Sequence, residues 1–151
     1  MTPDTLTMDE LPGLVGRELG PSSWHRITQE DIDVYADLTG DDNPIHVDEA
    51  AAAASPYGGR IAHCMLTLSM VVRPLREIYR VGDARMGIVY CYNRIRFPQA
   101  VPSGGRVRVR GTVAEVAEIA DGRQVTLALT FELEGVAKPA VAAELVLRHY
   151  R

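Results

Sequence analysis

The second half of the chain is built from segments that favour β-strands, separated by short turn sequences. Four segments have this character: residues 86–97, 106–116, 123–135 and 139–150. Residues 106–116 (RVRVRGTVAEV) alternate almost perfectly between polar and apolar, which is typical of a strand with one buried and one exposed face. Consecutive strands joined by short turns predict an antiparallel sheet.

The longest apolar segment, residues 62–79 (AHCMLTLSMVVRPLREIY), comes directly before these strands. Its apolar side chains would cover much of the circumference of a helix, which is typical of a central, buried helix. Pro74 has no N–H group to donate, so the helix should kink or end near it. One long helix followed by an antiparallel sheet predicts an α+β fold in which the sheet wraps the helix.

The length of 151 residues suits one domain or one subunit of a small oligomer. No linker or repeat divides the chain, so we expect a single domain over residues 1–151. Residues 1–13 hold acidic residues and prolines with no clear periodicity. We expect them to form a loose amino-terminal lead.

Charge and composition exclude several classes of function. The formal net charge of −4 does not favour a nucleic-acid partner. No apolar run approaches the ~18 residues needed to span a membrane, and no signal-peptide pattern is present. The two cysteines, Cys64 and Cys91, form neither a disulfide framework nor a metal-binding spacing. We therefore expect the reducing cytosol as the compartment.

Two helices are indicated before the apolar segment. Thr28 and Asp31 have the spacing of a capping box, and Gly40 suits the left-handed position that ends a helix. A helix is thus predicted from about Gln29 to Thr39. Asp48 can cap a second, short helix through the alanine run that follows it.

The ten residues TGDDNPIHVD (39–48) connect these two helices. If they were helical, Asp41 and His46 would project about 140° apart and could not share a target. Pro44 and the residue before it disfavour a helix, however, so we expect a tight turn at residues 42–44. Such a turn could bring Asp41 and His46 together around one water as an acid–base pair. The spacing alone favours the plainer alternative, a connecting turn with Asp41 as a cap and His46 on the surface.

Three segments together resemble the MaoC-like dehydratase family, which includes (R)-specific enoyl-CoA hydratases and NodN-like proteins. They are YADLTGDDNPIHVD, then GGRIAHCM, then RIRFPQAVPSGGRVRV, in that order within residues ~28–110. The sequence departs from the family pattern at Ala100, usually proline, and at Gly105, usually aspartate. It also departs at Cys64, where the family has the glycine of I-A-H-G-M.

This resemblance implies a hot-dog fold, in which a curved antiparallel sheet wraps a long central helix. It also implies a homodimer whose sheets join edge to edge, with the acyl tunnel near the interface. By the same resemblance Asp41 and His46 are the catalytic pair that holds the attacking water. Asp41 would be the principal base, and Asn43 would support the loop or orient the water.

The resemblance places the backbone N–H of Cys64 against the oxygen of the substrate thioester. The cysteine side chain could crowd the substrate and narrow its range or reduce the rate. A nucleophilic thiol is an alternative, since helix starts lower thiol pKa values, but a small apolar filler is the plainer interpretation. For His63 we expect a structural hydrogen bond within the start of the same helix.

Arginines alternate along two of the predicted strands, giving each strand a basic face: Arg94, Arg96, Arg106, Arg108 and Arg110. This face is either simply solvated or an aid to binding the phosphates of coenzyme A or of a carrier protein.

The resemblance implies an enzyme that hydrates trans-2-enoyl thioesters to (R)-3-hydroxyacyl thioesters, or runs the reverse dehydration. A hot-dog thioesterase and a non-catalytic acyl-binding partner subunit are the alternatives. No dinucleotide fingerprint or phosphate loop is present, and hydration needs neither metal nor redox centre. We therefore expect no cofactor beyond the coenzyme A or phosphopantetheine that the substrate carries. Acyl length, pathway and direction stay open.

Overall fold

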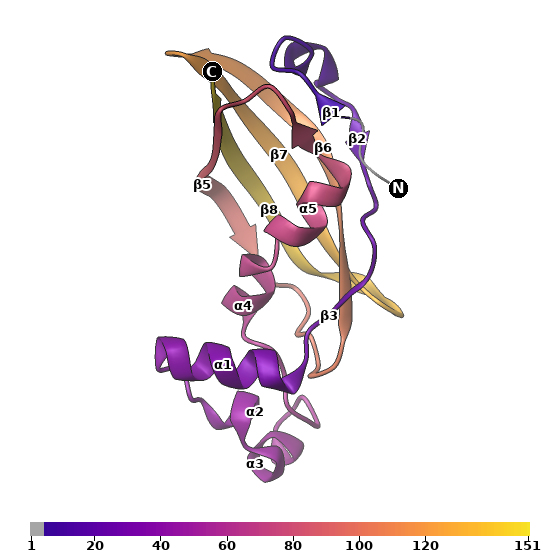
Figure 1. Cartoon of the computed structure of the whole chain (residues 1–151). Coiled ribbons are helices and arrows are strands. Elements are labelled where there is room, and N and C mark those ends of the chain that lie inside the picture. Colours follow the sequence, from indigo (N-terminus) through magenta and orange to yellow (C-terminus); the bar gives the residue numbers. More distant parts are fainter. Residues whose placement is uncertain (1–4) are drawn as a thin grey trace.

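A curved antiparallel sheet dominates the structure, a computed structural model that describes residues 5–151 (Figure 1). Its long strands are β5 (Met86–Arg96), β6 (Arg106–Ile119), β7 (Gly122–Leu133) and β8 (Val136–Tyr150). The strand order is β2-β6-β7-β8-β5, where β2 is Glu18–Leu19, and the short β3 (His25–Arg26) also pairs with β6. The prediction of an antiparallel sheet over the second half of the chain is confirmed.

Tight turns join β6 to β7 and β7 to β8. Asp121 adopts a φ of 57° between β6 and β7, and Gly135 a φ of 74° between β7 and β8. Aspartate and glycine both tolerate this left-handed region, which explains why these residues stand at the turns. At Gly122 a Cβ atom would lie 2.0 Å from the backbone oxygen of His149, so a side chain there would push β7 and β8 apart.

The apolar segment forms two helices in a row: α4 (Cys64–Ser69) and α5 (Val72–Ile78). The segment is helical as predicted, but it is not one continuous helix: the interruption expected near Pro74 divides it in two. The break lies at Met70, the residue whose carbonyl would accept the hydrogen bond that Pro74 cannot donate. Pro74 thus ends the first helix at the residue four positions before it in the sequence.

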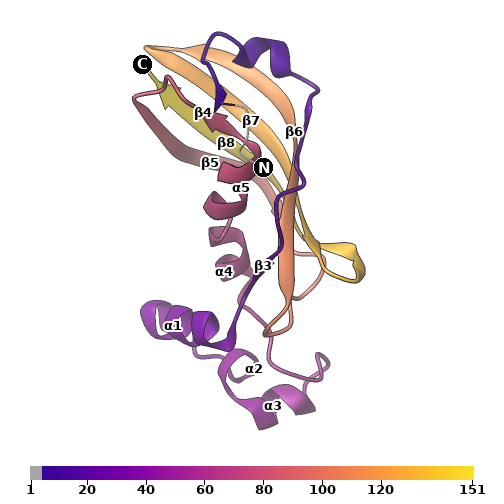
Figure 2. The same ribbon diagram turned by 45° about the vertical axis from the view of Figure 1, so that its right-hand side comes forward.

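Both helices lie along the concave face of the sheet (Figure 2). There they bury leucines against the inward-facing residues of the long strands, among them Phe131, Leu127 and Leu145, which are fully buried. Burying one such side chain contributes about 1.5–3 kcal/mol. The predicted arrangement of a sheet wrapped around a helical core is confirmed, with the core helix in two pieces.

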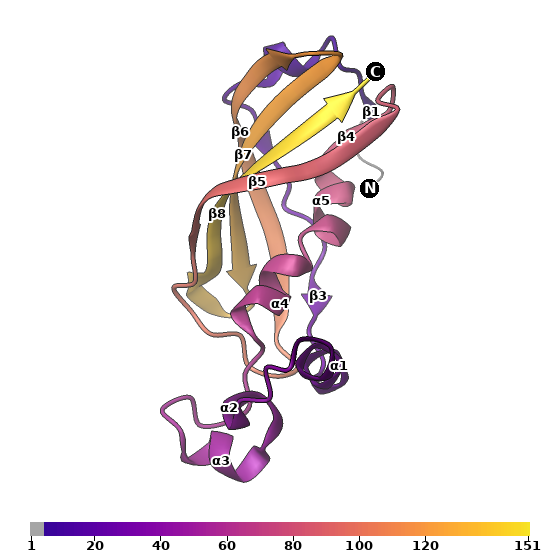
Figure 3. The ribbon, with the colours of Figure 1, turned by 90° about the vertical axis from the view of Figure 1, so that its left-hand side faces the viewer.

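Residues 5–14 pack at the end of the sheet where the carboxyl terminus lies (Figure 3). β1 (Thr5–Leu6) pairs in parallel with β4 (Arg80–Val81), and a 3-10 helix, η1, follows at Leu11–Leu14. Met8 and Leu11 are 0% exposed. The expectation of a loose lead is therefore wrong over residues 5–13; its first four residues lie outside the described part of the chain.

Three helices extend beyond the opposite end of the sheet: α1 (Gln29–Thr39), α2 (Pro44–Val47) and α3 (Glu49–Ala54) (Figure 1). The bounds of α1 are as predicted, because Thr28 and Asp31 form the capping box and Gly40 ends the helix at a φ of 75°. Asp48 caps α3 through the N–H of Ala51. Within residues 5–151, no helix is both long and apolar enough to cross a membrane.

The basic face of the sheet is partly neutralised by acidic side chains in β7 and in the turn that follows it. Arg106 pairs with Glu134, and Arg108 and Arg110 both pair with Glu132. The hydrogen bond from Arg108 is the main reason that the pKa of Glu132 lies below its usual range. The three arginines of β6 are therefore paired with carboxylates in the structure.

Candidate active site

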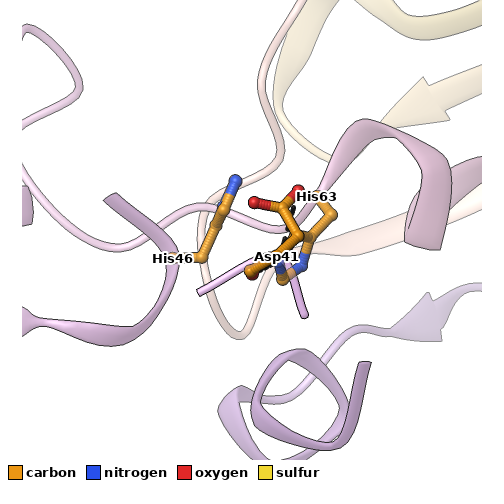
Figure 4. Close-up of side chains that lie close together, drawn as sticks. All are labelled: Asp41, His46 and His63. Carbon is orange, nitrogen blue, oxygen red and sulfur yellow. Dashed lines mark hydrogen bonds and ion pairs between the residues drawn. The ribbon is translucent and has the colours of Figure 1, made fainter. Parts of the chain in front are cut away.

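Asp41, His46 and His63 come together where α1, α2 and α4 meet (Figure 4). Asp41 directly follows the end of α1, His46 lies in α2, and His63 directly precedes α4. One potential ligand atom from each of the three side chains lies within 4.8 Å of the other two. The structure thus gathers two residues that the sequence analysis made a pair and one that it did not.

The turn between Asp41 and His46 differs in detail from the prediction. Residues 44–47 form one helical turn, with Pro44 in its first position, where a missing N–H costs nothing. Asn43 is non-helical as expected, and its Oδ1 accepts a hydrogen bond from the N–H of Ile45 at 3.3 Å. Asn43 therefore supports the loop as a helix cap. Because Asp41 lies outside this turn, helical spacing does not keep it apart from His46.

His46 is held by the loop that leads into α4. Its side chain is buried, and its Nδ1 lies 2.7 Å from the carbonyl oxygen of Ile61. A carbonyl only accepts, so Nδ1 carries a proton and donates it to this bond. In the neutral ring, Nε2 then holds a free lone pair. The N–H of Ile61 in turn donates to the carbonyl of Ile45 at 3.1 Å, which ties α2 to this loop.

Asp41 offers its carboxylate to the surface. Its side chain is 56% exposed, whereas His46 is 8% exposed. A carboxylate oxygen and a ring nitrogen within 4.8 Å of each other can share one water, because two hydrogen bonds of about 2.8 Å span such a gap. The expected convergence of Asp41 and His46 is therefore present. The alternative with His46 on the surface is not.

His63 makes a structural hydrogen bond as expected, but not within the start of α4, where its side chain makes no capping bond. Its Nε2 instead lies 2.9 Å from the main-chain carbonyl oxygen of Asp41. Its ring stacks on that of His46, with centroids 3.8 Å apart and planes at 29°. The ring of Tyr35 packs against it in a tilted arrangement, with centroids 4.9 Å apart and planes at 49°. Nothing in the local sequence signals these contacts, because they join segments that only the fold brings together.

Two histidines and a carboxylate are also ligands that a divalent metal accepts. Two features make this cluster a poor metal site. The stacked rings of His46 and His63 place their in-plane lone pairs in nearly parallel planes, which do not converge on one ion. His63 Nε2 is also already used as a donor to Asp41. The geometry fits a bound water better than a metal.

Cys64 is the first residue of α4, and it is exposed at the edge of this cluster. Partial desolvation raises the pKa of its thiol, and a backbone hydrogen bond offsets this only in part. The nucleophilic alternative therefore lacks the lowered pKa that it needs. The backbone N–H groups in the first turn of a helix have no partner within the helix, and they point out of its start.

The sequence profile of a family described as "MaoC like domain" matches residues 10–134 of the chain. A 3-hydroxyacyl-thioester dehydratase Z of Mycobacterium tuberculosis is 41% identical over 141 residues, covering 93% of each chain. Nodulation protein N of Rhizobium leguminosarum bv. viciae is 37% identical over 144 residues, covering 93% of this chain and 89% of that protein.

Solved structures share the fold. A MaoC-like dehydratase from Rhodospirillum rubrum superposes with a TM-score of 0.77 at 22% identity, covering 97% of each chain. An (R)-hydratase from A. caviae, described as involved in PHA biosynthesis, superposes with a TM-score of 0.69 at 25% identity. It covers 88% of this chain and 94% of the hydratase. The architecture is therefore the hot-dog fold expected from the sequence.

Proposed function

Because the chain belongs to the MaoC-like dehydratase family, we propose that it is a hydro-lyase acting on acyl thioesters. It adds water across the double bond of a trans-2-enoyl thioester to give the (R)-3-hydroxyacyl thioester, and it catalyses the reverse dehydration. The observation that carries this proposal is the convergence of the Asp41 carboxylate and the His46 imidazole at the start of α4. The names of the relatives, a 3-hydroxyacyl-thioester dehydratase and an (R)-hydratase, support the same reaction.

In the proposed reaction Asp41 and His46 hold one water between them. The oxygen of this water bonds to C3 of the substrate while one of its protons passes to the pair, with Asp41 as the principal base. The pair returns a proton to C2, so that a complete water is added. Asp41 suits the role of base because its carboxylate faces the surface, where a substrate can approach it. His46 Nε2 suits the partner role because Nδ1 is fixed by Ile61.

Negative charge develops on the thioester oxygen as water adds, and it needs a fixed donor. We assign this role to the backbone N–H of Cys64, which opens α4 beside the pair. Asn43 serves indirectly, as the cap that holds α2 and with it His46. No electrons are transferred in the reaction, and the conjugated thioester is already activated toward addition. We therefore propose that coenzyme A or phosphopantetheine enters only as part of the substrate.

A second copy of the chain is the proposed partner. β5 pairs with β8 along one edge and forms the end of the sheet in the described part of the chain. It exposes large apolar side chains: Met86, Ile88, Val89 and Tyr90, each 39–51% exposed. A long apolar edge strand is prone to pair with another strand. An antiparallel pairing of β5 with its copy would cover this surface in a two-fold dimer.

The test is to mix the purified protein with crotonyl-CoA and, separately, with a longer trans-2-enoyl-CoA. Hydration removes the absorbance of the conjugated thioester without releasing a thiol. A thiol reagent detects hydrolysis, after subtraction of the signal from Cys64 and Cys91. We expect loss of absorbance, no released thiol, and the (R)-alcohol on chiral analysis. Thiol release would identify a thioesterase instead, and no change with either substrate would contradict the hydratase proposal for coenzyme A thioesters.

A further inference from the structure

His63 is a buried histidine that contacts both members of the proposed catalytic pair. It is 2% exposed, and its ring lies between the main chain at Asp41 and the ring of His46. We propose that His63 is a positioning residue, whose ring edge fixes the backbone at Asp41 and whose face fixes the ring of His46. The proposal rests on the function proposed above, since it assigns a role within the same site.

The edge of the ring anchors a segment that has few other attachments. His63 Nε2 donates to the carbonyl oxygen of Asp41 at 2.9 Å. The N–H of Asp41 makes a longer bond, 3.4 Å, to the hydroxyl of Thr39. The side chain of Asp41 is 56% exposed, and its Oδ2 lies 4.0 Å from the same Nε2 of His63. The hydrogen bond from His63 is therefore the main restraint on the backbone position from which the Asp41 side chain extends.

The face of the ring sets the orientation of His46. The hydrogen bond from His46 Nδ1 to Ile61 holds one ring atom but leaves the ring able to tilt about that contact. The stacked ring of His63, at 3.8 Å, opposes such a tilt on one face. Tyr35 lies against His63 at 4.9 Å and helps to hold it in place. His63 thus contacts Tyr35 through a tilted ring pair and His46 through a stacked one.

His63 is placed to position these groups and not to exchange protons with a substrate. Its Nε2 is used in the bond to Asp41, and its Nδ1 is buried without a hydrogen-bond partner among the described residues. Neither nitrogen faces an open surface from which a substrate could reach it. Its effect on the reaction must therefore pass through Asp41 and His46.

Two substitutions separate the two contacts. His63→Phe keeps a ring that can stack on His46 but removes the donor to Asp41. His63→Gln keeps an N–H group near the position of Nε2 but removes the ring. His25→Phe is the matched control, because it removes a histidine hydrogen bond of similar length, 2.8 Å to Glu77, away from Asp41 and His46.

The first readout is the steady-state hydration of crotonyl-CoA. We expect His63→Phe to lower kcat by about 10–100-fold with KM within about two-fold, since a small misplacement of a catalytic group costs this much. The decrease in log kcat of His63→Gln should be at most two thirds of the decrease in His63→Phe. The control His25→Phe should keep the wild-type kcat. Melting temperatures verify that each variant is folded. A wild-type kcat in His63→Phe, or an equal loss in His25→Phe, would overturn the proposal.

The second readout needs no turnover. Amide hydrogen exchange at Ile45 and His46 reports how firmly the loop after Asp41 is held. We expect exchange there to be at least about ten-fold faster in His63→Phe than in the wild type or in His63→Gln, with α5 unchanged. Unchanged exchange would overturn the positioning role. If the wild type hydrates no enoyl thioester but this difference is seen, the proposed function fails while the positioning role stands.

Discussion

The carboxylate of Asp41 and the imidazole of His46 approach within 4.8 Å of each other, although one side chain is exposed and the other is buried. The turn after Gly40 leaves Asp41 at the surface, while the single helical turn begun by Pro44 directs His46 inward. A substrate can reach the exposed carboxylate of Asp41 from the surface, while the imidazole of His46 stays fixed on the buried side. This relationship underlies the proposed hydration chemistry.

His46→Asn tests whether Nε2 of His46 takes part in the reaction. The asparagine amide can still donate to the carbonyl of Ile61, as Nδ1 does at 2.7 Å, but nothing replaces Nε2. We expect a folded protein whose kcat is lower by about 10²–10⁴-fold, the range for a lost acid–base group. His46→Ala should lose as much activity and also melt at a lower temperature. A wild-type kcat in His46→Asn would remove Nε2 from the mechanism.

Cys64→Ser tests the role of the side chain that stands in place of the family glycine. Only the backbone N–H of Cys64 is assigned to the reaction, so we expect kcat to stay within about ten-fold of the wild type. Complete loss of activity in a folded Cys64→Ser protein, together with an acyl adduct on wild-type Cys64, would instead indicate a nucleophile.

The reactivity of the Cys64 thiol gives a pH-dependent check. Desolvation raises the pKa of Cys64, so at neutral pH the unreactive thiol prevails over the thiolate. In a Cys91→Ser background, we expect alkylation by iodoacetamide to be slow at pH 7. Its rate should rise with pH with a midpoint above 9.0, the ordinary pKa of a cysteine. A midpoint below pH 8 would mean an activated thiol.

Thr28→Ala tests the cap that sets the start of α1. It removes the acceptor for the N–H of Asp31 and the hydroxyl partner of the Asp31 carboxylate. We expect the free energy of unfolding to fall by about 1 kcal/mol, measured by urea denaturation. Asp37→Asn, on an exposed position of the same helix, is the control and should change it by less than about 0.5 kcal/mol. Equal stability of Thr28→Ala and the wild type would contradict the capping role.

Val89→Lys tests the proposed pairing of β5 with a second copy. A charge on an exposed edge strand opposes strand-to-strand association. By light scattering after gel filtration, we expect the wild type at about twice the chain mass of 16.5 kDa and Val89→Lys at the chain mass. Val136→Lys, at a residue of similar exposure on β8, should stay dimeric. A monomeric wild type at micromolar concentration would contradict the proposed dimer.

Helix ends were predictable where the signal is local. Thr28, Asp31 and Gly40 act on the backbone within a few residues, and α1 has the predicted bounds for that reason. Pro44 disfavours a helix through the residues before it, yet it serves as the first residue of a helical turn, where its missing N–H costs nothing. Pro74 did signal an interruption. The helix breaks at Met70 and not at Pro74, because Met70 carries the carbonyl that Pro74 leaves without a donor.

Contacts between distant segments were not predictable from patterns. Met8 and Leu11 gave no periodic signal, and their burial depends on where β4 and β6 lie in the fold. In the site, the motif identified Asp41 and His46. The position of His63 depends on where the fold places the start of α4 relative to α1 and α2, so its stacking on His46 is visible only in the structure.

Hydration of crotonyl-CoA by the wild type and by Asp41→Asn tests the central claim most directly. Asp41→Asn keeps the size of the side chain and the main-chain carbonyl that His63 binds, but it removes the base. The exposed neighbour Asp42, changed to Asn, is the control for charge. We predict a rate lower by about 10²–10⁴-fold in Asp41→Asn, with melting temperature and the Asp42→Asn rate unchanged. A near-wild-type rate in Asp41→Asn would contradict the assignment of this site as the catalytic centre.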